Sequence, residues 1–429
     1  MFNTPTHVIV VSHILLDWRL SSPDWLHALP SGPPSLQNAP AYDYEIADDV
    51  SMPSVLLSAK QRCFSPSEHP PTRIIVQGYP FLEGDTLLEK RTYAKEKVDG
   101  LRQRLMREPR GHKEMYGAIL VPETEKTRCG EADIGVLFCH NEGYSTMCGH
   151  ATIALGRFLI DTQDEAVFPR RKQVAFDAAK RECKLRLHAP CGVVDVAVPS
   201  QVEDDGRVRS DPKREVQFVS VRSFAAATDV VIEVPEEQVW PALCGTGRRA
   251  VKVDVAYGGA FYAIVQEQEL GFGRVRDGGV DLRRLDEATA VVKQLVGARV
   301  ELFRGHGLER DLEYLYGVIV VEEGEGRAGL GGLEGRLGVC FFADQQVDRS
   351  PTGSGVSARV ALARAKGLLG AGERVRFDSV LSARRGGEAG AFVGSDAGAG
   401  RVRVEGRAFY TGASAFAVED AFSRQGFLL

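Results

Sequence analysis

Short runs of β-branched and aromatic residues recur along most of the chain, separated by turn residues and by longer helical patterns. In the first half they predict strands at residues 74–76, 115–121, 134–139, 174–176, 183–188 and 193–198. In the second half they predict strands at residues 217–221, 251–255, 261–265, 314–321 and 338–342. Because helical patterns stand between these strands, the sequence predicts an α/β (α+β) protein.

Four segments have the pattern of a helix. Residues 86–107 place leucines on one side and many charged residues on the other, as a surface helix does. Residues 282–296 and 356–366 predict the helices of the second half. Residues 153–160 differ, because they are apolar almost all the way round. A helix of that kind is expected to be buried on all sides.

Other segments lack this regular pattern. Residues 1–72 contain Pro-rich and Ser-rich pieces, which predict an irregular and poorly ordered segment. The apolar run at 8–16 resembles the core of a secretion signal, but no Lys or Arg precedes it. Gly-rich stretches at 322–336 and 384–400 predict surface loops, and the alternation at 401–412 predicts the strands of a final hairpin.

Length, composition and charge narrow the class of protein. A chain of 429 residues fits two domains better than one. The net charge of −5, with no long basic block, argues against nucleic acid as a partner. No apolar span reaches about 20 residues, which argues against a membrane helix. The 8 cysteines contain no Cys-x-x-Cys pair, which is typical of reduced thiols in a cytoplasmic protein.

The order of elements divides the chain into two similar halves. We expect a divergent segment at 1–72, a first α/β domain at 73–205 and a second at 206–400. The charged stretch at 201–215 marks the change of domain, and residues 401–429 are expected to complete the first domain. In each half, strands lead into a Gly-rich turn and a helix, which indicates an internal duplication.

The turn before the first buried helix carries the candidate chemistry. Cys148 is followed by Gly149 and His150 at the start of that helix. Exposed N–H groups and the positive end of the helix dipole lower a thiol pKa, so Cys148 is a candidate catalytic base or nucleophile. A zinc site built from Cys139, His140, Cys148 and His150 is an alternative, but the spacing fits no usual zinc motif. The other cysteines are expected only to pack.

A similar turn at residues 348–355 precedes the helix of the second half. It contains Asp348, Thr352, Gly353 and Ser354. A phosphate-binding loop is one interpretation, but the Lys of such a loop is absent. Binding of a carboxylate by the first N–H groups of the helix is the better hypothesis.

Several blocks of sequence resemble the proline racemase family. They are Met147 to His150, residues 348–355, and the segments 108–112, 115–118, 257–263 and 405–412. The resemblance covers about residues 73–429, whereas residues 65–71 depart from the opening turn of the family. It implies two pseudo-symmetric domains, each a curved mixed sheet wrapped around a central helix, with the active site in the cleft between them.

The second motif departs from the racemases of this family. They carry a cysteine in both motifs, whereas this chain has Thr352 at the second position. Together with residues 140–146, this pattern resembles the branch that dehydrates trans-3-hydroxy-L-proline. Racemisation needs a base on one face of Cα and an acid on the other, whereas β-elimination needs only the base. A threonine hydroxyl is too weak an acid to replace the second thiol.

The resemblance implies a mechanism without metal or organic cofactor. The substrate, a cyclic imino acid, is expected to place its carboxylate between the two helix N-termini, at Gly149, His150, Gly353 and Ser354. His150 and Asp348 would hold its ring nitrogen. Cys148 would remove the Cα proton and the 3-hydroxyl would leave, giving Δ1-pyrroline-2-carboxylate. The group that protonates the leaving hydroxyl stays open between His150, Thr352 and a bound water.

Two other functions remain as alternatives. One is a proline or hydroxyproline racemase or epimerase, which Thr352 disfavours. The other is an inactive homologue that only binds a cyclic amino acid. The sequence leaves a homodimer open.

Overall fold

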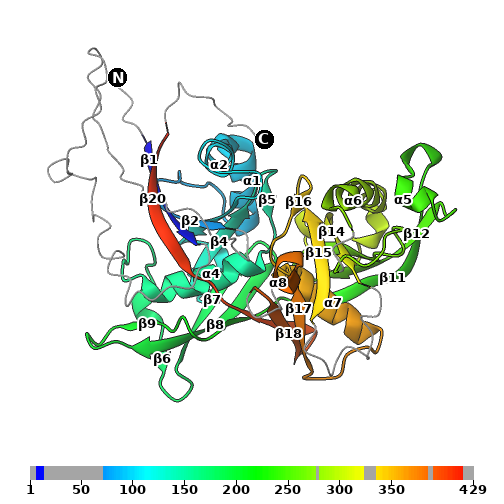
Figure 1. Cartoon of the computed structure of the whole chain (residues 1–429). Coiled ribbons are helices and arrows are strands. Elements are labelled where there is room, and N and C mark those ends of the chain that lie inside the picture. Colours follow the sequence, from blue (N-terminus) through cyan, green and yellow to red (C-terminus); the bar gives the residue numbers. More distant parts are fainter. Residues whose placement is uncertain (1–5, 14–70, 277–279, 323–334, 385–389, 419–429) are drawn as a thin grey trace, which may run out of the picture.

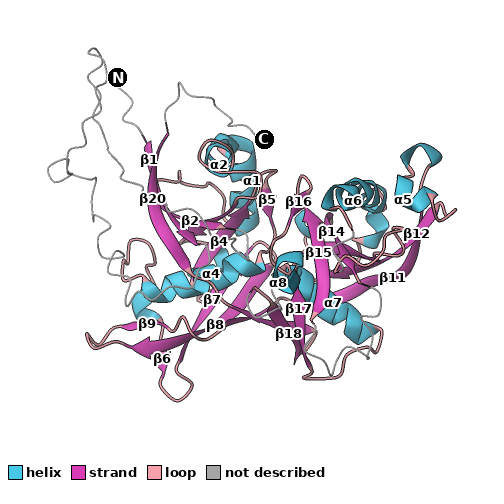
Figure 2. Ribbon diagram, viewed as in Figure 1, coloured by secondary structure: helices cyan, strands magenta, loops and turns pink. Residues whose placement is uncertain are grey.

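The computed structural model describes residues 6–13, 71–276, 280–322, 335–384 and 390–418. They form two lobes, each a curved sheet around one helix (Figures 1 and 2). Helix α4 (Gly149–Asp161) lies in the first lobe and helix α7 (Gly353–Ala365) in the second. The arrangement expected from the sequence, with a curved sheet around a central helix in each half, is therefore observed.

The first lobe has six strands in a row next to β20 (Tyr410–Val418). They are β1 (Thr6–His13), β2 (Thr72–Gln77), β3 (Tyr116–Val121), β4 (Ile134–Cys139), β7 (Glu182–Ala189) and β8 (Gly192–Val202). Neighbours in this row are paired, with β2–β3 and β4–β7 parallel and the other pairs antiparallel.

The second lobe repeats this arrangement with strands β11 to β18. They are β11 (Phe224–Glu233), β12 (Ala250–Tyr257), β13 (Phe261–Gln266), β14 (Leu315–Val321), β15 (Arg336–Phe342), β17 (Arg374–Asp378) and β18 (Phe392–Gly398). Here too the third pair and the fifth pair are parallel and the others antiparallel. The same order of strand directions on both sides matches the internal duplication that the sequence predicts.

Strand β1 corrects one expectation of the sequence. The composition of residues 1–72 predicts an irregular segment, but Thr6–His13 form a strand that pairs antiparallel with both β2 and β20. The run of Val and Ile fits a strand, but its partners lie far away in the sequence, so no local pattern identifies them. The rest of the expected irregular segment, up to residue 70, lies outside the described residues.

Two further expectations about the C-terminal part are wrong. The glycines of residues 384–400 predict a loop, but this segment contains β18. The strand β19 (Arg401–Gly406) pairs with β18 and β10 (Val216–Val219), and not with β20 as the expected final hairpin requires. A turn with positive φ at Gly398, Ala399 and Gly400 joins β18 to β19, which explains the tight connection. Most of the predicted loop at 322–336 lies outside the described residues.

The helices on the outer side follow the predicted pattern with one break. The segment 86–107 forms two helices, α1 (Leu87–Lys97) and α2 (Asp99–Met106), interrupted at Val98. Thr86 and Glu89 cap α1 reciprocally. Helix α6 (Leu282–Gly297) occupies the same place in the second lobe, between β13 and β14.

The remaining helices and strands are short. They are α3 (Glu125–Arg128), α5 (Pro241–Cys244), α8 (Val380–Arg384), β5 (Tyr144–Ser145), β6 (Phe176–Asp177), β9 (Val208–Ser210), β16 (Gln346–Val347), and 3-10 helices at Arg171–Gln173, Glu236–Gln238, Val300–Leu302 and Arg310–Leu312. Within the described part of the chain, no helix has the length and apolar character needed to span a bilayer.

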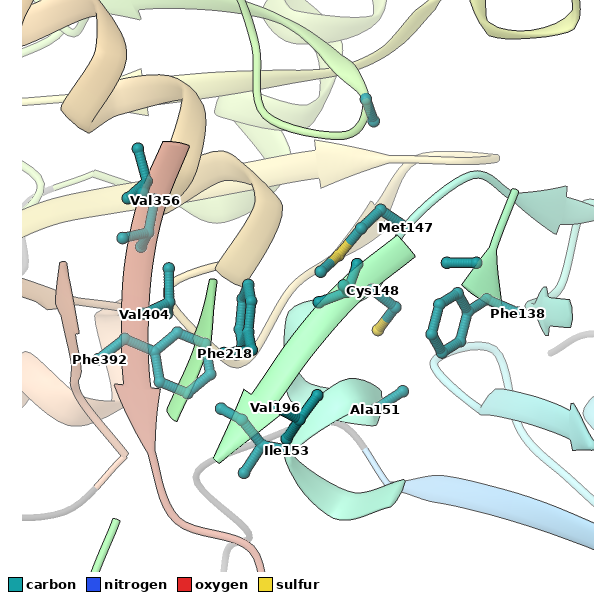
Figure 3. Close-up of a cluster of buried hydrophobic side chains, with 14 of the residues drawn as sticks. Phe138, Met147, Cys148, Ala151, Ile153, Val196, Phe218, Val356, Phe392 and Val404 are labelled. Carbon is teal, nitrogen blue, oxygen red and sulfur yellow. The ribbon is translucent and has the colours of Figure 1, made fainter. Parts of the chain in front are cut away.

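The two central helices are packed inside the sheets. Every residue of α4 except Arg157 is buried, as the all-round apolar pattern predicts. Strand β19 contacts both α4 and α7, so the two lobes share one hydrophobic core. Figure 3 shows part of this core, where Met147 and Cys148 lie at the N-terminal end of α4.

Candidate active site

The N-termini of the two central helices meet at a contact between two glycines. A Cβ added to Gly149 would lie 2.4 Å from the Cα of Gly353, and a Cβ on Gly353 would lie 2.6 Å from the Cα of Gly149. Only glycine fits at both positions. The first N–H groups of a helix have no partner within it, and they carry the positive end of the dipole. Both positive ends therefore meet at one point.

A small cavity lies at this point. It offers about 10 Å³ for the centre of a water-sized sphere, which is room for about one water molecule. Its lining includes all seven residues that the sequence analysis selected: Cys148, Gly149, His150, Asp348, Thr352, Gly353 and Ser354. Residues from the two distant motifs are thus brought together as expected, whereas their chemical roles stay predictions.

Five further residues complete the lining. They are Tyr116, Met147, Tyr262, Tyr316 and Phe342. Tyr116, Met147 and Tyr262 lie within segments that carry the family resemblance, so a signal for them exists in the sequence. Tyr316 and Phe342 lie on β14 and β15, where they look like ordinary strand residues. Only the fold identifies them.

Cys148 is the N-cap residue of α4 and is buried. Its Sγ lies 3.4 Å from Nδ1 and 3.5 Å from Nε2 of His150. Burial raises the pKa of the Cys148 thiol well above its usual range, although the N–H of Ala151 and the hydroxyl of Tyr116 act in the opposite direction. The lowered pKa expected at the helix N-terminus is therefore not found, because burial of the thiol outweighs the hydrogen bonds that favour the thiolate.

Thr352 occupies the equivalent position at α7 and is held by a network of hydrogen bonds. Its hydroxyl donates to Oδ2 of Asp348 at 2.8 Å, and its N–H donates to Oγ of Ser350 at 3.1 Å. The N–H of Ser350 donates to Oδ1 of Asp348 at 2.8 Å. These contacts hold Thr352 at a φ of 62°, a left-handed conformation that costs a β-branched residue about 1–3 kcal/mol.

Asp348 is the acidic residue of the cavity. Burial raises its pKa to about 6, and the hydrogen bonds from Thr352 and Ser350 limit the rise. The carboxylate is therefore ionised at neutral pH. It is suited to face a positive group such as a protonated ring nitrogen.

Three tyrosines line the aromatic side of the cavity. The Tyr116 hydroxyl forms a hydrogen bond with Oγ of Ser145, and it lowers the pKa of the Cys148 thiol. The Tyr262 hydroxyl lies 2.7 Å from Oγ of Ser354. Burial raises the pKa of Tyr116, Tyr262 and Tyr316 well above the usual range, so all three phenols stay protonated.

Polar contacts between the lobes surround this cavity. Nε of Arg349 donates to Oε2 of Glu114 at 2.7 Å. The hydroxyl of Thr146, next to the first motif, donates to the carbonyl of Gly259 in the second lobe at 2.6 Å. These contacts hold the two lobes together around the site.

The zinc alternative finds no support in the described residues. Among them, no group of three or more His, Cys, Asp or Glu side chains is arranged to hold a metal. Instead of sharing a ligand sphere with Cys148, His140 uses Nδ1 to accept from the N–H groups of Glu142 and Gly143, at 3.3 Å each.

The fold and the paired helix N-termini define a class of protein. Comparison with known proteins identifies this class. The family model described as "Proline racemase" matches residues 66–427. The chain belongs to this family. It is 41% identical over 368 residues to the human trans-3-hydroxy-L-proline dehydratase, covering 84% of this chain and 91% of that protein. It is 40% identical over 372 residues to the trans-L-3-hydroxyproline dehydratase of Xenopus tropicalis, covering 84% and 92%.

Solved structures show the same fold at lower identity. A probable proline racemase from Agrobacterium radiobacter K84 is 21% identical, with a TM-score of 0.64, over 84% of this chain and 94% of that one. A hydroxyproline epimerase from Agrobacterium vitis is 22% identical, with a TM-score of 0.63, over 84% and 93%.

Proposed function

We propose that this chain is a trans-3-hydroxy-L-proline dehydratase, a hydro-lyase that forms Δ1-pyrroline-2-carboxylate. Relatives about 40% identical over most of its length are named for this activity. The observation that carries the proposal is the pairing of one thiol with one threonine. Cys148 and Thr352 cap the two helices that meet at the cavity. A site of this kind has a base for one face of Cα and no thiol acid for the other.

The substrate carboxylate binds where the two helix N-termini meet. The N–H groups of Gly149, His150, Gly353 and Ser354 surround this point, and both helix dipoles favour a negative charge there. The carboxylate keeps its charge throughout the reaction, and extra charge develops on it when Cα loses its proton. The same N–H groups therefore stabilise the transition state.

Asp348 and His150 hold the ring nitrogen. Asp348 is ionised above a pH of about 6, so it can pair with the protonated nitrogen of the substrate. This pairing orients Cα towards the Cys148 sulfur. A protonated nitrogen next to Cα also makes that carbon more acidic.

Cys148 removes the Cα proton as a thiolate. Burial disfavours the thiolate in the closed cavity, whereas the N–H groups of Ala151 and His150 favour it. The sulfur and the substrate carboxylate thus share the same helix N-terminus. Thr352 gives its hydroxyl proton to Asp348 in a hydrogen bond and supplies no second acid.

A product assay tests the proposal. The purified protein should convert trans-3-hydroxy-L-proline to Δ1-pyrroline-2-carboxylate and should leave both 4-hydroxyproline isomers and L-proline unchanged. Incubation of L-proline in deuterated water distinguishes the alternatives. Exchange at Cα with inversion would establish a racemase, and binding of the 3-hydroxy substrate without any pyrroline product would establish an inactive homologue.

A cytoplasmic location and a homodimer also belong to this proposal. All seven cysteines of the described residues are free thiols, which suits a reducing compartment.

A further inference from the structure

Tyr116 lies beside the sulfur that removes the Cα proton. It projects from β3 into the cavity and is 2% exposed. Its hydroxyl forms a hydrogen bond with Oγ of Ser145, and it lowers the pKa of the Cys148 thiol, which lines the same small cavity. Its ring meets the ring of His150 edge to face, with centroids 5.0 Å apart. Because Nδ1 of His150 lies 3.4 Å from Sγ of Cys148, the phenol is held beside the sulfur.

The configuration of the substrate decides where the acid must stand. In the trans-3-hydroxy isomer, the hydroxyl and the carboxylate lie on opposite faces of the ring. The hydroxyl consequently shares a face with the Cα hydrogen. A base that removes this hydrogen faces the same side as the departing oxygen, so the acid must lie beside Cys148.

We propose that Tyr116 is the catalytic acid that protonates the departing 3-hydroxyl. This inference rests on the proposed dehydratase function and names the group that completes it. The Cys148 thiolate takes the Cα proton, and the C–H electron pair forms the bond between C2 and C3. The C3–O bond breaks, and its oxygen takes the proton of Tyr116 and leaves as water.

A second proton transfer then restores both groups. The new thiol of Cys148 returns its proton to the phenolate of Tyr116, which restores the thiolate and the phenol with which the cycle began. One proton thus passes from Cα to the leaving water by way of the two side chains. No external acid is consumed before the enamine changes to the imine.

The other candidates for the acid are less suitable. Thr352 caps the helix on the other side of the cavity and donates its hydroxyl proton to Asp348. Tyr262 shares its hydrogen bond with Ser354, also on the side of α7. His150 lies close to Cys148, but it is assigned to the ring nitrogen. Tyr116 lines the cavity beside His150 and Cys148, and its hydroxyl lowers the pKa of that thiol. It has no role assigned in binding the substrate.

The test compares two leaving groups in one variant. Chloride leaves without a proton, so trans-3-chloro-L-proline bypasses the acid. In Tyr116→Phe, kcat on trans-3-hydroxy-L-proline is expected to fall about 100-fold, the usual size of general acid catalysis. The rate of chloride release should fall much less. We expect the ratio of chloride to hydroxyl elimination to rise at least tenfold, with KM nearly unchanged.

Control variants separate catalysis from structure. Tyr316→Phe removes the hydroxyl of another buried phenol in the lining but leaves the proposed acid in place. In this variant the ratio of chloride to hydroxyl elimination should stay within about threefold of the wild type. The proposal is overturned if the ratio of chloride to hydroxyl elimination in Tyr116→Phe rises less than tenfold. A residue that only lines the cavity, or one that only activates Cys148, would slow both substrates alike. A tenfold rise in His150→Asn, with none in Tyr116→Phe, would assign the acid to His150.

A measurement on the unaltered protein keeps the proposal testable if the variant does not fold. In cis-3-hydroxy-L-proline the hydroxyl lies on the face opposite to the Cα hydrogen, away from Tyr116. The wild type should dehydrate this isomer at least 100-fold more slowly than the trans isomer, and equal rates would overturn the proposal. If the wild type dehydrates neither isomer, the proposed function itself is wrong.

Discussion

The N-termini of α4 and α7 are built on the same plan, yet they hold their capping residues differently. Cys148 has an extended backbone, with φ at −145°, and its sulfur lies 3.4 Å from Nδ1 of His150. Thr352 has a φ of 62° and is tied to Asp348. One copy of the plan thus presents a sulfur to the cavity. The other presents a hydroxyl whose proton is already shared with a carboxylate.

In the proposed mechanism, this difference separates binding from chemistry in a duplicated scaffold. Both halves supply helix N–H groups, and the strand directions around them repeat in the same order. The proposed anion-binding part is therefore symmetric, because it depends on backbone alone. The proposed proton-transferring part is not, since it depends on the side chain of one residue in each half.

Removal of the sulfur should have the largest effect. In Cys148→Ser, kcat is expected to fall by at least about 1,000-fold, because a hydroxyl is a far weaker base than a thiolate. Steady-state assays of pyrroline formation measure this loss. Cys183→Ser is the matched control, since that thiol is equally buried but lies in the core away from the cavity. Turnover retained in Cys148→Ser would contradict the role of the thiolate.

The second-largest effect is expected when the two helix N-termini are forced apart. Gly149→Ala places a methyl group 2.4 Å from the Cα of Gly353, so the helices must move apart. A displacement of about 1 Å at an active site costs about 100-fold in rate, and we expect kcat/KM to fall by that factor. Gly143→Ala is the control, because a Cβ there would meet no atom within 4 Å. An unchanged kcat/KM in Gly149→Ala would show that the contact is not needed.

The charge of Asp348 should appear in the pH dependence of stability. Its pKa rises from the ordinary value of 3.8 to about 6 in the folded chain, so the folded state binds the proton more tightly between these values. The free energy of unfolding therefore falls as the pH rises from about 4 to 6, by roughly 3 kcal/mol for this group. Urea denaturation at several pH values should show this contribution in the wild type and not in Asp348→Asn. Parallel curves for the two proteins would contradict the raised pKa.

The substitution with the smallest expected effect makes the N-termini of the two helices more alike. Thr352→Cys places a thiol on the second face of Cα, so some protons should return there. We expect deuterium incorporation into recovered substrate to rise about tenfold over the wild type, still far below the rate of a racemase. NMR of the substrate in deuterated water measures it, with Thr352→Ser as the control. An equal rise in the serine variant would show that the thiol is not responsible.

The sequence predicts the parts of this molecule that depend on local patterns. The buried helix α4, its glycine and the matching turn before α7 are all visible in short segments. The placement of β1 between β2 and β20 is not visible in any short segment, because the two partner strands lie about 60 and 400 positions away in the sequence. Strand pairing over such distances depends on the whole sheet.

The residues that line the cavity fall into the same two groups, those that the sequence identifies and those that only the fold identifies. Residues that follow a motif, such as Cys148 and Asp348, can be selected from the sequence. Tyr316 and Phe342 reach the cavity only because β14 and β15 pass beside it. The sequence predicts the pKa shift of Cys148 with the wrong sign, since a local argument counts the helix N-terminus but not the burial of the thiol in the folded chain.

The size of the cavity has a consequence for substrate entry. Room for about one water molecule is too little for a five-membered ring that carries a carboxylate. The two lobes must therefore move apart for each substrate that binds, so that opening and closing of the site are part of every turnover.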